Sequence, residues 1–322
     1  MPVPRKTSLW LLPLVAVAVI AIFFFFRRST PATDVWQRNQ GFIFGTLYNI
    51  TYQYDRDLQT ELEAELKKVD QEFSMFNGES TVARINRGET DVERTPMFNE
   101  VFDLAMRITA DTEGAFDVTV APLVNAWGFG FKHQQLPTPQ QVDSLLQIRS
   151  QMDFAAIAKG YGCDVVARKL QEYGIGNYMI EVGGEIALRG KNSHDEDWRI
   201  GVNKPTEDSL SVHGELQAIL KLTDVCMATS GNYRNFYYKD GRRYAHTIDP
   251  RTGYPVEHEL LSATVIAPNS ATADAYATAF MVLGLDGARK VLSRHPDMKA
   301  YLIYTNQDGE FAVWHSPGLD IE

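Results

Sequence analysis

Hydrophobic residues recur along the first half of the chain at spacings that predict helices. In residues 57–73, apolar side chains follow one another at steps of three and four, which predicts a helix with one buried face. Two further helices are predicted to begin at Thr95 and Thr138, because each is a capping residue followed by a proline. A fourth is predicted to follow residue 153 and to end at Gly174.

The spacing changes to every second residue after position 177, which predicts strands. Short alternating runs separated by turn residues favour antiparallel pairing, and Asp240-Gly241 has the composition of a tight hairpin turn. Asn269 precedes a last predicted helix as its cap. The sequence therefore predicts an α+β fold, with a largely antiparallel or mixed sheet and packed helices. The predicted strands are 177–182, 185–190, 198–203, 213–223, 260–268, 300–305 and 310–314, with a first pair between 41 and 54.

Two segments between the predicted helices show neither the helical nor the strand spacing of apolar residues. Residues 74–88 contain Asn77, Gly78 and Ser80, which predicts a loop that places Phe76 at its edge. Residues 114–130 combine strand-forming residues with a proline and with glycines near Trp127. Glycine beside an aromatic residue allows the backbone to approach a flat ligand closely.

The amino terminus contains an uncharged, mostly apolar run at residues 8–26, with two basic residues on each side. As a helix it is about 28 Å long, which is enough to cross a bilayer core. We predict an uncleaved transmembrane helix within residues 1–28, a tether at 29–40 and one folded domain at 41–322. A cleaved signal peptide is the alternative, but the run is long and no small-residue cleavage site follows it.

Composition narrows the classes of partner. The chain has 31 basic and 41 acidic residues, a formal net charge of −10, and the first 28 residues contain no acid. The remainder is therefore strongly acidic, which argues against nucleic acid as a partner. An acidic domain that binds a phosphate needs local bases or a divalent cation. The two cysteines, Cys163 and Cys226, form no metal-binding or redox motif.

Three groups of polar residues are candidates for chemistry. Asp274 and Thr278 are four residues apart on the last predicted helix, so their side chains face the same way. They could bind Mg²⁺ together, or Asp274 could be a buried acid that is hydrogen-bonded to its neighbour. Asp153 and Lys159 flank the start of the fourth helix. Separately they would be a capping acid and a solvated base, and together they would form a site for an anionic ligand. Residues 228–255 place His246 among small and polar residues, in a surface hairpin or beside a ligand.

Six blocks, in order, make the chain resemble the ApbE family, the FAD:protein FMN transferases. The resemblance extends across nearly all of residues 41–317. The blocks are GAFDVTVAPLVNAWGFG (114–130), DFAAIAKGYG (153–162), IEVGGEIALRG (180–190), ATSGNYRN (228–235), RRYAHTIDPRTGYPV (242–256) and SATVIAPNSATADAYATAFMVLG (262–284).

The resemblance implies an Mg²⁺-dependent enzyme that splits FAD, releases AMP and joins FMN to a threonine of a partner protein. It implies that the side chains of Asp274 and Thr278 bind the metal, together with the main-chain carbonyls of Ala156 and Ala277. His246 is the candidate acceptor of the threonine proton, or a hydrogen-bond donor to a phosphate. Contacts to FAD are implied at Phe44, Phe76, Ala115, Phe116, Asp117, Asp153, Lys159 and Ile248.

The resemblance also implies a setting. Acceptors would be subunits of sodium-pumping quinone reductases or related electron-transfer complexes. We expect a bacterial inner-membrane protein with its catalytic domain on the periplasmic side. Many relatives have tyrosine at Phe76, methionine at Phe44, and a lipid-bearing cysteine instead of an apolar helix. Two other functions remain open, an FAD pyrophosphatase and a flavin-binding protein without turnover.

Overall fold

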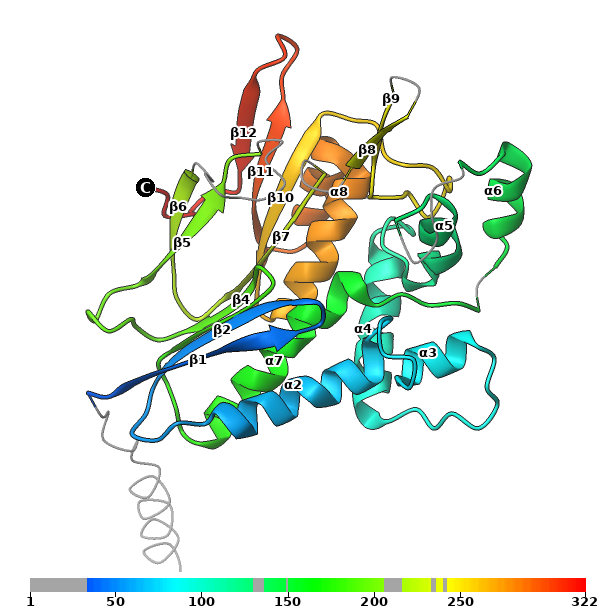
Figure 1. Cartoon of the computed structure of the whole chain (residues 1–322). Helices are drawn as coiled ribbons and strands as arrows, with labels where there is room; N and C mark the ends of the chain where they lie inside the picture. Colours follow the sequence, from blue (N-terminus) through cyan, green and yellow to red (C-terminus); the bar gives the residue numbers. More distant parts are fainter. Residues whose placement is uncertain (1–33, 130–135, 149, 206–215, 233–235, 240–241) are drawn as a thin grey trace, which may run out of the picture.

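The structure is a computed structural model, shown in Figure 1, that describes residues 34–129, 136–148, 150–205, 216–232, 236–239 and 242–322. The apolar run at residues 8–26 and the predicted turn at 240–241 lie outside the described residues. Within these ranges, no helix combines the length and the hydropathy needed to cross a bilayer.

An eight-stranded sheet forms the centre of the fold, and every neighbouring pair in it is antiparallel. The predicted α+β class with antiparallel pairing is therefore confirmed. In spatial order the strands are β1 (Trp36–Ile43), β2 (Thr46–Gln53), β3 (Tyr178–Val182), β4 (Glu185–Arg189), β7 (Cys226–Gly231), β10 (Leu260–Ala267), β11 (Lys299–Thr305) and β12 (Phe311–His315).

Helices cover one face of this sheet, and a hairpin covers part of the other (Figure 1). The helical face holds the largest apolar cluster, in which Val265 of β10 and Phe280 of the last helix are fully buried. The hairpin of β5 (Trp198–Asn203) and β6 (Leu216–Leu222) packs on the opposite face, around Ile186 and Ile303. The main helices are α2 (Gln59–Phe73), α4 (Pro96–Asp111), α7 (Ala155–Glu172) and α8 (Ser270–Leu292).

Shorter elements complete the chain at the end where α7 begins. A fourth apolar cluster forms there around Leu123, Trp127, Val142 and Ile248. Trp127 also donates a hydrogen bond from Nε1 to the Gly253 carbonyl at 2.7 Å. The shorter elements are α3 (Thr81–Asn86), the 3₁₀ turn η1 (Val118–Val120), α5 (Ala121–Ala126), α6 (Pro139–Leu145), β8 (Phe236–Lys239) and β9 (Arg242–Ala245).

The structure corrects three local predictions. β1 begins at Trp36, inside the segment predicted as a tether, because residues 36–40 pair with residues 49–53 of β2. The predicted loop at 74–88 contains α3, which begins because the Ser80 side chain accepts a hydrogen bond from the Ala83 amide. Residues 114–130 contain η1 and α5, where Asp117 caps the first turn.

Helices α7 and α8 cross closely at their N-terminal ends. A Cβ on Gly160 would lie 2.6 Å from the Ser270 carbonyl carbon and 2.9 Å from the Ala271 Cα, so only glycine fits there. Asp164 of α7 accepts hydrogen bonds from the amides of Ser270 and Ala271, at 2.8 and 2.9 Å. A carboxylate at this helix N-terminus stabilises α8 and fixes its first turns against α7.

Candidate functional site

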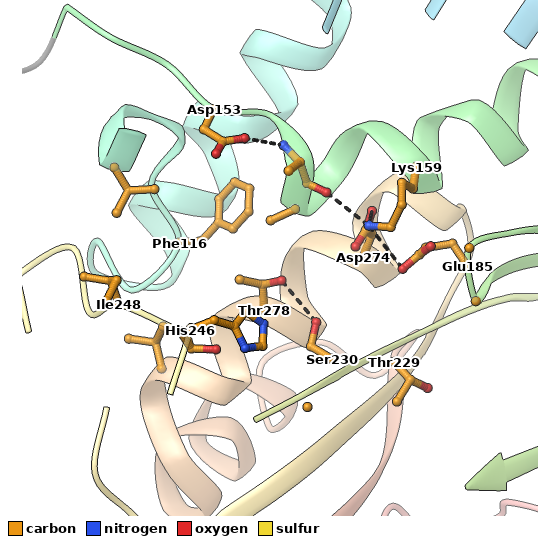
Figure 2. Close-up of a pocket in the computed structure, with 18 of the residues that line it drawn as sticks. Phe116, Asp153, Lys159, Glu185, Thr229, Ser230, His246, Ile248, Asp274 and Thr278 are labelled. Atoms are coloured by element: carbon orange, nitrogen blue, oxygen red, sulfur yellow. Dashed lines mark hydrogen bonds and ion pairs between the residues drawn. The ribbon is translucent and has the colours of Figure 1, made fainter. Parts of the chain in front are cut away.

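A cavity of about 610 Å³ lies where the N-terminal ends of α7 and α8 meet the ends of the central strands. This volume is within the range of small-molecule sites. The segments that line it are far apart in the sequence: residues 115–118, the start of α7, the β3–β4 turn, the end of β7, residues 246–250 and one face of α8. Figure 2 shows labelled side chains from these segments, among them Phe116, Asp153, Asp274 and Thr278, around a common space.

Most of the predicted site residues meet in this cavity. They come from four separate blocks of the sequence, which the fold brings together in space. The predicted residues that line it are Ala115, Phe116, Asp117, Asp153, Ala156, Lys159, His246, Ile248, Asp274 and Thr278.

Three predicted residues lie elsewhere. Phe44 is at the tip of the β1–β2 hairpin with a positive φ of 53°, and its ring packs beside Gly162 rather than in the cavity. Phe76 is 79% exposed and Ala277 is fully buried, and neither residue lines the cavity. Arg251, within the block at 242–256, is paired with Asp249 at 2.8 Å and does not line the cavity.

Asp274 is held by the α7–α8 crossing. Its carboxyl is buried, and Oδ2 accepts a hydrogen bond from the Gly160 amide at 3.0 Å. In a regular helix that amide would donate to the Ala156 carbonyl, four residues earlier. The close approach of α8 therefore brings Asp274 beside the same turn of α7 that supplies the Ala156 carbonyl.

Lys159 lies between two carboxylates (Figure 2). Its Nζ is 3.4 Å from Glu185 Oε1 and 3.9 Å from Asp274 Oδ2, and it donates to the Ala155 carbonyl at 3.1 Å. Burial lowers the pKa of Lys159, but the two carboxylates outweigh burial and raise it above its ordinary value. The ammonium group therefore stays charged at neutral pH.

The two carboxylates share this one cation. Burial raises the pKa of Glu185, while the nearby Lys159 ammonium favours the ionised carboxylate and acts in the opposite direction. Burial also raises the pKa of Asp274, against Lys159 and the Gly160 amide. Glu185 Oε2 is buried and has no hydrogen-bond partner among the described residues. The group thus has one carboxylate more than it has cations.

Hydroxyl groups line the side of the cavity next to Asp274. Thr278, one turn later on α8, forms a hydrogen bond with Ser230 Oγ at 3.1 Å. Thr229 pairs with Thr264 at 2.9 Å, which holds β7 in register with β10. His246 lies on the same side as Thr278 and Ser230 in Figure 2, and its ring is 6.3 Å from that of Phe129.

The opposite side is built by Asp153 and the turn after α4. Asp153 accepts a hydrogen bond from the Ala155 amide at 2.8 Å, and its own amide donates to the Val118 carbonyl at 2.7 Å. Burial raises the pKa of Asp153. Phe116 is buried with its ring beside this pair (Figure 2). This side offers an apolar surface with one carboxyl group, which suits the ring of a ligand.

The oxygen groups at this site fit a hard divalent cation. No three His, Cys, Asp or Glu side chains in the described ranges cluster as a metal site would need. Mg²⁺, however, commonly takes only one or two carboxylates and completes its shell with phosphates and water. Asp274 with the Thr278 hydroxyl and the Ala156 carbonyl supplies such a set, and the unbalanced carboxylate favours a cation.

Glu185 is the site residue that the sequence reasoning missed. It lies within the block at 180–190, and the resemblance implies no role for it. The signal was present, because an acid directly after Gly183-Gly184, in a strand of buried residues, needs a partner. The structure supplies Lys159 as that partner, 26 residues earlier in the chain.

Comparisons with known proteins agree with this geometry. The model of the ApbE family matches residues 44–302. The chain belongs to the ApbE family. The FAD:protein FMN transferase of Haemophilus influenzae is 36% identical over 84% of this chain and 86% of its own. That of Escherichia coli K12 is 33% identical over 94% of this chain and 95% of its own.

Solved structures of ApbE proteins have the same fold. The flavin transferase ApbE from Vibrio cholerae superimposes with a TM-score of 0.78 at 34% identity, covering 88% of this chain and 97% of that one. The apo form of the Pseudomonas stutzeri flavinyl transferase ApbE gives 0.76 at 30% identity, covering 88% and 95%. The ApbE fold is thus present over almost the whole described chain.

Proposed function

We propose that this ApbE-family chain is an FAD:protein FMN transferase. It takes FAD into the cavity, moves the FMN part to a threonine hydroxyl of an acceptor protein and releases AMP. The observation that carries this proposal is the meeting, in one cavity, of Asp274, Thr278, Lys159 and His246 beside an apolar surface. The activity named for relatives at 33–36% identity over most of the chain supports it.

The ring systems of FAD would lie against the apolar side of the cavity. Phe116, Ala115 and Ile248 are all buried there and present carbon surface. Asp153 and Asp117 place carboxyl groups beside this surface for polar atoms of the rings. An apolar pocket with a few placed polar groups is the usual form of a cofactor site.

The pyrophosphate would lie at the charged end. We propose that Asp274, Thr278 and the Ala156 carbonyl hold Mg²⁺ there, with the Ala277 carbonyl as a further candidate. Bound Mg²⁺ supplies positive charge to phosphate oxygens as the phosphorus is attacked. Lys159 adds a second positive charge, held in place by Glu185 and the Ala155 carbonyl. These groups compensate for the acidity of the domain at the point where an anion must bind.

His246 would take the proton of the acceptor hydroxyl. The threonine oxygen forms a bond to the FMN phosphorus, and the bond from that phosphorus to the AMP phosphate oxygen breaks. AMP leaves with the electron pair, and the hydroxyl proton passes to the imidazole. A group with a near-neutral pKa suits this step, and a positioned base contributes about 10²–10⁴-fold.

The acceptor and the cellular setting are further parts of the proposal. We propose that acceptors are subunits of sodium-pumping quinone reductases or related electron-transfer complexes. The apolar run at residues 8–26 would anchor the chain in the bacterial inner membrane, with the catalytic domain on the periplasmic side. A reporter fused to the carboxyl terminus and active in only one compartment tests that orientation.

Product analysis tests the reaction. The full chain is incubated with FAD and Mg²⁺, with and without an acceptor protein, and AMP and free FMN are measured. A transferase releases AMP only when the acceptor is present, and free FMN stays low. Equal AMP and free FMN without an acceptor would instead identify a pyrophosphatase, and FAD bound without any AMP would identify a flavin-binding protein.

A further inference from the structure

The Lys159 ammonium group lies close to a carboxylate that the proposed cation needs. Its Nζ is 3.9 Å from Asp274 Oδ2, which is within ion-pair distance. A positive charge at that position repels any cation bound to Asp274. The site therefore works only if something limits the contact between Lys159 and Asp274.

Glu185 is placed to do this. Its Oε1 is 3.4 Å from Lys159 Nζ, nearer than Asp274 Oδ2. The Ala155 carbonyl accepts a hydrogen bond from the same ammonium at 3.1 Å. Both contacts draw Nζ toward the start of α7 and the β3–β4 turn.

The backbone around Glu185 is shaped for this contact. Glu185 is 4% exposed and follows a two-residue turn, Gly183-Gly184, in which both residues have positive φ. A Cβ on Gly183 would lie 2.7 Å from Thr46 Cγ2 and 3.3 Å from Lys159 Cδ, so glycine lets both Thr46 and the lysine stem pack against the turn. The turn thus fixes the carboxylate and the path of the lysine together.

The second oxygen of Glu185 strengthens the argument. Oε2 is buried and has no hydrogen-bond partner in the part of the chain that the structure describes, although Glu185 lines the cavity. An unsatisfied buried carboxylate oxygen costs free energy, so a purely structural role would favour a residue without it. What the carboxylate does contact is the lysine. Asp274, by contrast, does accept a hydrogen bond: among the described residues, the Gly160 amide donates to its Oδ2.

We propose that Glu185 is a positioning residue that holds the Lys159 ammonium away from Asp274 and so keeps Asp274 available to a divalent cation. The inference rests on the proposed function for the cation site at Asp274. It assigns opposite effects on cation affinity to the two residues: Lys159 lowers the affinity of the site for the divalent cation, and Glu185 reduces this effect of Lys159.

The test is Mg²⁺ binding, measured by calorimetry on the full chain, in a double-mutant cycle of Glu185→Gln and Lys159→Met. Glu185→Gln keeps the size of the side chain and removes its charge. It should weaken Mg²⁺ binding about tenfold, or about 1.4 kcal/mol, because the ammonium moves onto Asp274. Lys159→Met should strengthen Mg²⁺ binding, an effect that structural damage would not produce.

The double variant separates the proposed route from a simple loss of negative charge. If Glu185 acts through Lys159, Glu185→Gln causes little further change when Lys159 is already methionine. An equal loss in both backgrounds would overturn the inference, and so would unchanged Mg²⁺ affinity in Glu185→Gln. No Mg²⁺ binding to the unaltered chain would instead overturn the proposed cation site, and this inference with it.

Discussion

Substitution of Gly160 tests the helix crossing that positions Asp274. In Gly160→Ala the added Cβ would lie 2.6 Å from the Ser270 carbonyl carbon and 2.9 Å from the Ala271 Cα, and it would also meet the Ser270 carbonyl oxygen. These are backbone atoms at the start of α8, so no side chain can rotate to make room. α8 must move away from α7, and the Gly160 amide loses Asp274.

The size of the effect follows from three contributions. Overpacking in a well-packed core costs about 1–3 kcal/mol, and the lost hydrogen bond to a carboxylate costs about 1.5–3 kcal/mol. Alanine is the better helix former by about 1 kcal/mol. We therefore expect the free energy of unfolding to fall by about 1.5–5 kcal/mol, and Mg²⁺ binding to weaken because Asp274 is displaced.

Urea unfolding followed by tryptophan fluorescence measures the first effect, and calorimetry with Mg²⁺ measures the second. Gly176→Ala is the matched control, since nothing lies within 4 Å of its added Cβ and its φ is not positive. It should leave stability unchanged or raise it by about 0.4–1 kcal/mol. Equal stability of the two variants would refute the crossing geometry described above.

Three further predictions concern the site and its support. Asp274→Asn should abolish Mg²⁺ binding and lower FMN transfer by roughly a hundredfold or more, whereas Asp286→Asn, on the same helix and 96% exposed, should do neither. His246→Ala should lower the transfer rate by about 10²–10⁴-fold with FAD binding retained, and a parallel loss of FAD binding would favour the phosphate-donor role. Burial raises the pKa of Asp164 from 3.8 to about 6, so between these pH values the folded state binds a proton that the unfolded state has lost. The free energy of unfolding therefore falls by about 3 kcal/mol as pH rises through this range. Asp164→Asn should remove this pH dependence, as measured by urea unfolding from pH 4 to 6.

The sequence predicted the elements where local signals were strong. Thr95 and Thr138 cap α4 and α6 as predicted, since each side chain accepts a hydrogen bond from an amide three residues on. Gly174 has the positive φ of 75° expected of a residue that ends a helix. The prediction of a tether up to residue 40 was wrong. The mostly polar residues 36–40 give no clear strand signal of their own, and pairing with β2 decides their conformation.

The site was predictable as far as its residues could be recognised one by one. Asp274 and Thr278 share a helix face, and their spacing alone indicated a common direction. The contact between Lys159 and Glu185 joins α7 to β4 across the helix–sheet layer, which no spacing in the sequence encodes. Phe76 is exposed outside the cavity, and its contact with FAD stays a prediction, because the position of a residue in a predicted loop does not show which way its ring turns.

The mass of an acceptor protein tests the central claim most directly. The full chain, FAD and Mg²⁺ are incubated with a redox subunit that contains the candidate threonine, and the intact acceptor and its fragments are weighed. The account predicts the mass of one FMN phosphoester on that threonine, its loss in Asp274→Asn, and its loss when the acceptor threonine is replaced by valine. An acceptor that gains no mass with any divalent cation, while FAD is consumed, would contradict it.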